Sequence, residues 1–250
     1  MAMKVPDETL LAEWRALAPA WIKQSREGRN ANRTGLIDPV MLNACGDVRG
    51  KRVLDCGCGE GRFVRMMVQR GAGYVLGIDL CPPMIDAARE LQSGMDEYRV
   101  ANAEDLSFLA DRTFDLAISY LNHCDLEDWL ANTREVFRIL KPGGHFLIAN
   151  LHPMRSASGY WHKDSAGNKL HCILDKYMSE GPRRWRMLAC DFTNFHRTLE
   201  TYIRGFRRAG FLVDQILEPT VTPEQVATWP ELDDELRVPN FIVYVLLKPN

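Results

Sequence analysis

The sequence lacks any apolar run long enough to cross a bilayer. Its longest wholly apolar stretch is Phe241–Leu247, whereas a membrane-spanning helix needs about 20 such residues. The amino-terminal segment MAMKVPDETLLAEWRAL carries acidic side chains and no continuous apolar stretch of the kind found in secretory signals. We therefore expect a chain that has no membrane partner and works in the cytoplasm.

A charge excess of either sign is also missing. The 250 residues include 31 basic and 33 acidic side chains, which gives a net charge of −2. This balance provides no bulk attraction to nucleic-acid phosphates, although a local basic patch could still form. The hydrophobic content of 46% and the charged content of 26% are ordinary for a globular domain. We expect one domain over residues 1–250 with no nucleic-acid partner, and the oligomeric state stays open.

Neither paired cysteines nor a CxxC motif is present. The chain has 7 cysteines, an odd number, and Cys56 and Cys58 are too close in sequence for an ordinary disulfide. Thiols kept reduced in the cytoplasm are the simplest interpretation. A zinc site is the alternative, but the missing CxxC pair disfavours it, so we expect no metal.

The sequence does contain an alternation of strand-like and helix-like segments. Apolar strand-like runs lie at 51–56, 74–79, 98–103, 114–119, 144–151, 211–218 and 241–248. Helical periodicity lies at 8–24, near 38–46, after the turns at Gly61, Pro82 and Asp125, and at 196–209. Asp125, with Asp128 three residues later, is expected to cap a helix that Pro142 ends. This alternation predicts a mostly parallel sheet with helices on both faces.

The strongest signal is VLDCGCGEGR at 53–62, where an apolar strand runs into three alternate glycines and a helix starts at once. Gly57, Gly59 and Gly61 let the backbone approach a ligand and take dihedral angles that other residues avoid. The alternative is a glycine-rich turn without a ligand. The strand before the turn and the helix after it favour a binding site.

Asp79 closes the next strand-like segment. A carboxylate there can accept hydrogen bonds from ribose hydroxyls, although it could also merely cap the following helix. Together with the glycine turn it predicts an adenosine-type ligand. A nicotinamide dinucleotide fits less well, because the GxGxxG motif needs glycine where Arg62 stands. S-adenosylmethionine has no pyrophosphate and does not require that glycine.

These segments resemble the successive motifs of class I S-adenosylmethionine-dependent methyltransferases of the small-molecule type. The resemblance covers about residues 50–153 and is carried by VLDCGCGEGR, GIDLCPPMIDAAR, ANAEDLSF, FDLAISYLNHCDLEDW and ILKPGGHFLIANLHP. It implies a Rossmann-like α/β fold with a seven-stranded sheet of order 3-2-1-4-5-7-6, the last strand being antiparallel. It also implies an enzyme whose cofactor is S-adenosyl-L-methionine.

The resemblance further implies roles for individual positions. Asp55 and the Gly57–Gly61 turn would face the methionine part of the donor, and Asp79 would hold its ribose. The remaining donor contacts that we expect are Cys56, Leu80, Met84, Asn102, Ala103, Glu104 and Ser119. Asn102 departs from the family, which usually has Asp there, but an Asn oxygen can still accept a hydrogen bond. Cys81 stands where Ser commonly caps a helix.

We expect four parts within the domain: a helical cap at 1–48, a donor-binding core at 49–152, an insertion at 153–195, and a closing helix and strands at 196–250. The insertion interrupts the strand–helix rhythm and is rich in aromatic and basic residues. A disordered loop is the alternative, but the aromatic content argues against it. We predict that the insertion is a lid over the acceptor.

Residues that could remove a proton from the acceptor are expected after the strands, where ligands bind in this architecture. His152 ranks first and His123 second, with Tyr120 as a positioning partner. His162 and His196 are more distant candidates. A single histidine is more often structural than catalytic, and methyl transfer needs a base only when the nucleophile must lose a proton.

The expected reaction is methyl transfer to an oxygen or nitrogen of a small organic molecule. A methyltransferase acting on RNA or another macromolecule is the enzymatic alternative. The Asn-Pro-Pro-aromatic motif of nucleic-acid amino methyltransferases is missing, since Ser119-Tyr-Leu-Asn122 stands in that region. Arginines within 183–208 keep that alternative open. A protein that binds the donor without catalysis is the third possibility, because a donor site and the chemistry are separable.

Overall fold

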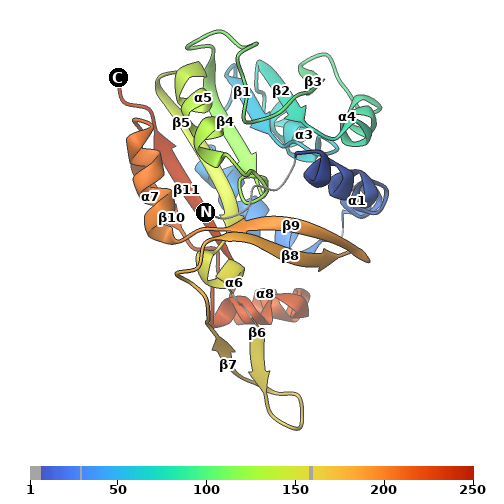
Figure 1. Ribbon diagram of the computed structural model, residues 1–250. Coiled ribbons are helices and arrows are strands. Elements are labelled where there is room, and N and C mark those ends of the chain that lie inside the picture. The colour runs from blue at the N-terminus through green and yellow to red at the C-terminus, as the bar shows by residue number, and fades with distance from the viewer. Residues whose placement is uncertain (1–6, 29, 158–159) are drawn as a thin grey trace.

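The computed structural model describes residues 7–28, 30–157 and 160–250, and Figure 1 shows a central sheet with helices on both sides. The seven strands of the sheet are β1 (Arg52–Cys56), β2 (Tyr74–Asp79), β3 (Asp96–Val100), β4 (Phe114–Tyr120), β5 (Leu140–Leu151), β10 (Leu212–Leu217) and β11 (Phe241–Leu247). Their order is β10-β11-β5-β4-β1-β2-β3. Strands β1 to β5 pair in parallel, and β11 is antiparallel to both of its neighbours. The predicted order 3-2-1-4-5-7-6 and the Rossmann-like fold class are confirmed.

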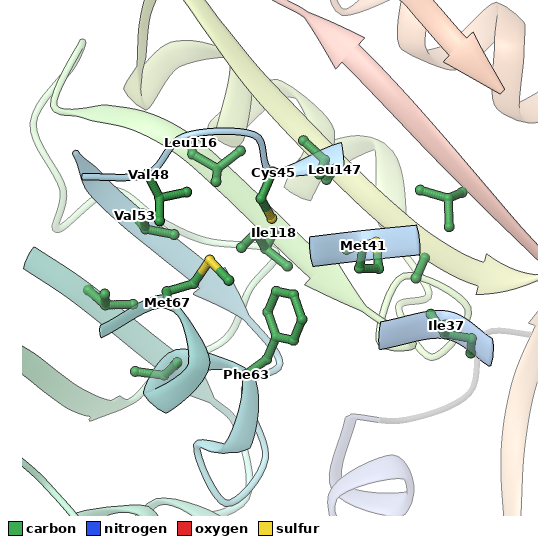
Figure 2. Packing of buried hydrophobic residues seen from close by; sticks show 14 of the residues in the cluster. Ile37, Met41, Cys45, Val48, Val53, Phe63, Met67, Leu116, Ile118 and Leu147 are labelled. Atoms are coloured by element: carbon green, nitrogen blue, oxygen red, sulfur yellow. The ribbon is translucent and has the colours of Figure 1, made fainter. Parts of the chain in front are cut away.

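Successive residues of a strand point to opposite sides of the sheet, and here helices bury both sides. Val53 belongs to one hydrophobic cluster and Leu54 to the other. The first face is covered by α2 (Asp38–Ala44), α3 (Arg62–Gln69) and α4 (Pro82–Arg89). Figure 2 shows Phe63 and Met67 of α3 packed beside Val53 and Ile118. The second face is covered by α5 (Trp129–Ile139) and α7 (Leu199–Arg208).

These clusters set the register of the strands. A fully buried Leu, Ile or Phe side chain contributes about 1.5–3 kcal/mol, and a slip of one residue would exchange the two faces of a strand. The carboxyl ends of β1, β2 and β4 are therefore held side by side, with Cys56 paired to Ile78 and to Ser119.

The amino-terminal part forms three helical segments: α1 (Asp7–Glu27), the π-helical η1 (Ala31–Ile37) and α2. The predicted helices at 8–24 and 38–46 correspond to α1 and α2. Ala18 of α1 is fully buried against Met84 and Cys81, so α1 packs against the start of α4. No helix among the described residues is long and apolar enough to cross a membrane.

The segment 153–195 folds into a short helix and two hairpins. It contains α6 (Pro153–Ala157), β6 (Tyr160–Lys163), β7 (Lys169–Ile173), β8 (Gly181–Met187) and β9 (Cys190–His196). In Figure 1 the β6–β7 hairpin projects away from the central sheet, whereas β8–β9 runs across the molecule toward α1. Between β10 and β11 lie α8 (Pro223–Thr228) and the 3-10 helix η2 (Pro230–Leu236).

Three local predictions need correction. The strand expected at 98–103 is β3, Asp96–Val100, and the chain leaves the sheet after Val100. Asp125 does not cap α5, because that helix starts later and the carboxylate of Asp128 accepts from the Ala131 N–H at 2.9 Å. Strand β5 begins at Leu140 rather than at Gly144, with a register shift against β4 near its start.

Candidate functional site

The glycine turn after β1 has a geometry that only glycine tolerates well. Gly57, Gly59 and Gly61 have φ values of 71°, 55° and 82°. A Cβ on Gly57 would lie 2.1 Å from Asn122 Cγ, and one on Gly61 would lie 2.7 Å from the ring of Tyr98. A side chain at either position would therefore collide with its neighbours. At Gly59 the nearest atom is Trp21 Nε1 at 3.7 Å, so the space beside Gly59 is open.

Asp79 at the end of β2 is held by the same turn. Its carboxylate accepts from the Gly59 N–H at 2.9 Å and from the Cys81 N–H at 2.8 Å. Burial raises the pKa of Asp79, and the two backbone hydrogen bonds oppose that rise. Each carboxylate oxygen has two lone pairs, so both oxygens can still accept from a ligand.

A cavity of about 110 Å³, here called the turn cavity, lies above Asp79. The residues singled out in the sequence that line it are Gly57, Gly59, Asp79, Leu80, Cys81, Met84, Asn102, Ala103, Glu104, Tyr120 and Asp125. Its other wall is helix α1, which contributes Leu10, Leu11, Trp14 and Trp21. Helical periodicity predicted a buried face on α1, but it gave no sign of what that face would cover.

A second, smaller cavity of about 50 Å³, here called the inner cavity, shares Trp21, Gly57, Gly59 and Tyr120 with the turn cavity. Asp55 faces it and accepts no hydrogen bond from the described residues. Burial, and then the charge of Asp79, raise the pKa of Asp55 to about 8, against the opposing effect of Arg62. A buried carboxylate without a partner is costly, so Asp55 is suited to a cationic ligand group.

Arg33 of η1 faces the same inner cavity and was not anticipated from the sequence. Its guanidinium lies 3.8 Å from the centre of the Trp21 ring and forms no ion pair with the described residues. Arg33 is 8% exposed, and burial lowers its pKa to about 10, with a smaller contribution from Arg62. Glu60 and Arg62 also line the inner cavity, but Glu60 pairs with Arg65 and Arg62 pairs with Asp38. Asp55 and Arg33 are left without an ion-pair partner among the described residues, a pattern complementary to an α-amino acid.

Tyr120 lies between the turn and inner cavities, but its hydroxyl is already committed. It donates to Asp38 Oδ1 at 2.8 Å, and Arg62 donates to both oxygens of Asp38 at 2.7 and 2.8 Å. Burial and the charge of Asp38 raise the pKa of Tyr120 well above its ordinary value. The phenol therefore stays protonated and is suited to positioning rather than to proton abstraction.

His152, the first-ranked base, lines none of these cavities. The Met154 N–H donates to its Nδ1 at 3.1 Å, so Nε2 carries the proton and donates to Glu218 Oε1 at 3.1 Å. Burial lowers the pKa of His152, while Glu218 opposes the effect. Both ring nitrogens are thus committed to structural contacts, which argues against a catalytic role.

His123 is placed even less favourably for catalysis. It is fully buried, and its ring lies 5.6 Å from that of Trp129 and 6.1 Å from that of Phe206. Burial lowers the pKa of His123 to about 3, so the ring stays neutral. The chain turns directly after β4 and directs this side chain into the aromatic cluster instead of a cavity.

Five other candidates also lie outside the turn and inner cavities. Cys56 packs in the hydrophobic cluster on the second face, and Ser119 beside it in the sheet is fully buried. Gly61 supports the turn without lining either cavity. His162 stacks on His171 in the β6–β7 hairpin, and His196 Nδ1 lies 2.7 Å from Ser156 Oγ.

A larger cavity of about 440 Å³, here called the outer cavity, adjoins the turn cavity. The two share Trp14, Trp21, Leu121 and Asp125. Aromatic side chains from distant parts of the chain line the outer cavity: Trp14, Trp21, Trp185, Phe192 and Phe241. Charged side chains at its wall are Arg33, Asp125, Arg155, Arg186, Glu231, Asp234 and Glu235. No group of His, Cys, Asp or Glu in the described part of the chain is arranged to hold a metal ion.

Comparison with known proteins gives consistent matches. A family profile described as a methyltransferase domain matches residues 54–148. The solved structure of an S-adenosylmethionine-dependent methyltransferase from Mesorhizobium loti is 34% identical, with a TM-score of 0.77 over 84% of this chain and 96% of that one. A provisionally assigned S-adenosylmethionine-dependent methyltransferase from Listeria monocytogenes is 31% identical, with a TM-score of 0.76 and the same coverage.

A curated relative, the ubiquinone biosynthesis O-methyltransferase of Neisseria meningitidis serogroup C, is 28% identical over 184 residues, which are 72% of this chain and 75% of that protein. The glycine turn of this chain also lies within the segment that the family profile matches. Identity above 30% over nearly the whole length of both solved structures leaves one assignment: this chain belongs to the class I S-adenosylmethionine-dependent methyltransferases and is an enzyme that uses S-adenosylmethionine.

Proposed function

We propose that this enzyme transfers a methyl group to an oxygen or nitrogen of a small organic molecule held in the outer cavity. The observation that carries the proposal is the outer cavity itself, which shares a wall with the turn cavity. Its volume of about 440 Å³ lies within the range of about 300–1,000 Å³ typical of small-ligand pockets. Its aromatic lining suits an acceptor with a large apolar part.

Donor binding is assigned to the turn and inner cavities. Asp79 is suited to the ribose hydroxyls, because its fixed carboxylate retains free lone pairs. The adenine would lie along Leu80 and Met84, with Asn102, Ala103 and Glu104 at its edge. Asp55 is suited to the ammonium group of the methionine part and Arg33 to its carboxylate, since each is buried with no ion-pair partner among the described residues.

Bound S-adenosylmethionine supplies a methyl carbon on a positively charged sulfur. The residues of this chain contribute mainly position and exclusion of water, because holding two reactants in line can supply about 7–11 kcal/mol of the barrier. Trp21 lines all three cavities, and Tyr120 is fixed through Asp38 between the turn and inner cavities. Both side chains are therefore placed to confine the donor while the acceptor approaches from the outer cavity.

Three of the arginines that kept a nucleic-acid substrate open form ion pairs within the protein. Arg184 pairs with Glu13 and Arg186 pairs with Asp191. Arg204 of α7 likewise pairs with Glu200. Such pairing reduces the unbalanced positive charge that phosphate binding requires. The name of the Neisseria relative, an O-methyltransferase of ubiquinone biosynthesis, supports a small acceptor with a hydroxyl group.

The test is formation of S-adenosylhomocysteine by the purified enzyme with S-adenosylmethionine and a fractionated cell extract. We expect turnover with the small-molecule fraction, and mass spectrometry would then identify the methylated product. The nucleic-acid and protein fractions of the same extract serve as controls. Turnover with a macromolecular fraction alone would overturn the proposal.

A further inference from the structure

A carboxylate stands where the turn and outer cavities meet. Asp125 follows β4 by five positions and lines both cavities. The sequence suggested only that it caps the next helix, a role that Asp128 fills instead. Since the donor is assigned to one cavity and the acceptor to the other, Asp125 lies beside both reactants. This inference therefore rests on the proposed function.

The contacts of Asp125 leave it able to receive a proton. Its Oδ1 accepts from Asn194 Nδ2 on β9 and, at 3.7 Å, from the Cys124 thiol. Oδ2 has no hydrogen bond among the described residues. No arginine or lysine forms an ion pair with this carboxylate in that part of the chain, and the guanidinium of Arg197 instead donates to the carbonyls of Leu126 and Glu127.

The environment also suits Asp125 to basic chemistry. Burial raises its pKa, and a carboxylate with a higher pKa is a stronger base. The negative charge of Asp79 acts in the same direction, whereas Arg197 and the amide of Asn194 oppose it. A sulfonium in the neighbouring cavity would favour the ionised carboxylate, because an opposite charge nearby stabilises it.

Other candidate bases are less well placed. His152 and His123 line neither cavity, and the Tyr120 hydroxyl donates to Asp38. Among the acids of η2, Asp234 pairs with Lys169, and Glu235 accepts from Asn240 at 2.6 Å. These acids line the outer cavity alone, so they do not border the donor.

We propose that Asp125 is a catalytic base, and that Asn194 is a positioning residue that orients it. The oxygen or nitrogen of the acceptor forms a bond to the methyl carbon while the carbon–sulfur bond breaks and its electron pair stays on sulfur. The proton of the attacking hydroxyl or amino group passes to Oδ2 of Asp125 and later to water. Because Asn194 belongs to β9, the β8–β9 hairpin takes part in the chemistry as well as in enclosing the cavity.

The experiment measures the initial rate of S-adenosylhomocysteine formation at saturating donor, with the small-molecule fraction of a cell extract as the acceptor pool. Asp125→Asn should lower this rate about 100-fold or more while changing the Kd for S-adenosylhomocysteine less than about threefold. Added formate should partly restore Asp125→Ala, since it supplies a diffusible carboxylate. Asp86→Asn, at an exposed carboxylate of α4, is the matched control and should keep the wild-type rate.

Asn194→Ala should lower the rate about tenfold, within the range of a general base, and should have no further effect in the Asp125→Asn background. A structural role for Asn194 would instead make the two losses in rate multiply in the double variant.

Turnover by Asp125→Asn within threefold of wild type would overturn the inference and leave the proposed function standing. Absence of formate rescue in a folded Asp125→Ala would also overturn it. If the wild-type enzyme turned over no small molecule, the proposed function would fail and the inference with it.

Discussion

The turn cavity, which we assign to the donor, and the outer cavity, which we assign to the acceptor, are built in different ways. Most of the turn-cavity wall that is not α1 comes from residues that directly follow β1, β2, β3 and β4, at the carboxyl ends of neighbouring parallel strands. The outer cavity takes most of its wall from α1, η1, the loop after β4, the β8–β9 hairpin and η2, and β5, α6 and β11 contribute one residue each. A site at adjacent strand ends follows from strand order, whereas one made of distant loops depends on how each insertion packs.

Because the two cavities are built from different parts of the chain, donor affinity and catalytic rate should respond to different substitutions. Substitutions on the donor side should change the affinity for S-adenosylhomocysteine, and substitutions on the acceptor side should change the rate at saturating donor. Trp14, Trp21 and Leu121 line both cavities, so substitutions there should change both quantities, whereas Asp125→Asn should change mainly the rate.

The largest effect on the donor side is expected from Gly59→Val. The space beside Gly59 is open to the cavity, so a valine side chain would occupy ligand volume and would also strain a backbone with φ of 55°. Calorimetry should show a loss of affinity for S-adenosylhomocysteine of about 100-fold or more, which is about 2.7 kcal/mol. Gly94→Ala, at a glycine with ordinary φ and open surroundings, is the control. Binding by a folded Gly59→Val at wild-type affinity would contradict the donor assignment.

Asp79→Ala should weaken the donor next most strongly. It removes hydrogen bonds from ribose hydroxyls to a charged acceptor, worth on the order of 1–3 kcal/mol. It also frees the N–H groups of Gly59 and Cys81, so the turn itself should loosen. Calorimetric titration with S-adenosylhomocysteine measures the change, and an unaltered Kd in the folded variant would rule out ribose binding by Asp79.

Asp55 should make donor binding depend on pH. Because its pKa in the folded protein is about 8, above the ordinary value of 3.8, the native state holds an extra proton between these values. The free energy of unfolding of the ligand-free protein should therefore fall as pH rises from 4 to 8. Asp55→Asn should remove this fall, so at pH 8 the variant should be more stable than wild type by at least about 1 kcal/mol.

In the wild-type enzyme, affinity for S-adenosylhomocysteine should rise with pH, whereas the stability of the ligand-free fold falls. The affinity should rise about tenfold from pH 6 to pH 8, as the carboxylate that meets the ammonium group becomes ionised. Asp55→Asn should show a flatter profile. Thermal melts and calorimetry at both pH values provide the readouts, and identical profiles for the two proteins would exclude Asp55 from the donor site.

His152→Ala should separate stability from catalysis. Its ring nitrogens contact the Met154 N–H and Glu218, so the variant should lose on the order of 1–3 kcal/mol of unfolding free energy. The rate at saturating donor should stay within about threefold of wild type. Chemical denaturation and the extract assay measure the two quantities. A fall of about 100-fold in rate without loss of stability would instead make His152 the base.

The smallest effect concerns the two hairpins of 153–195. We predict that hydrogen exchange slows in β8–β9 when S-adenosylhomocysteine binds, since Glu13 of α1 accepts from the Thr193 N–H at 2.8 Å and α1 lines the turn cavity. The β6–β7 hairpin should show no change. If binding slowed hydrogen exchange equally in both hairpins, the whole segment would respond as one lid. If binding changed exchange in neither hairpin, a lid would be excluded.

The predicted donor residues could be singled out from the sequence because their signals are local. Asp55, the glycine turn and Asp79 each stand at the end of an apolar run, so strand order alone brings them together. The same rule failed for His123, which also follows a strand. Periodicity locates the end of a strand but does not determine where a loop side chain points.

The residues contributed by η1 and the β8–β9 hairpin carried fewer signals. Arg33 lines the inner and outer cavities and Asn194 lines the outer cavity, and local sequence patterns indicate neither position. Asp125 carried a local signal, but its spacing to Asp128 favoured a helix cap. In the folded protein the later acid occupies the cap, and Asn194 binds the earlier one. A contact between residues 125 and 194 leaves no trace in local periodicity.

The position of α1 has a kinetic consequence. The turn cavity, at about 110 Å³, is smaller than the range typical of ligand pockets, and α1 forms one of its walls. We therefore expect α1 to move outward when the donor enters and again when the product leaves. Since Trp14 and Trp21 also line the outer cavity, we expect the same movement of α1 to widen the acceptor side. If that movement is slower than bond formation, it sets the upper limit on turnover.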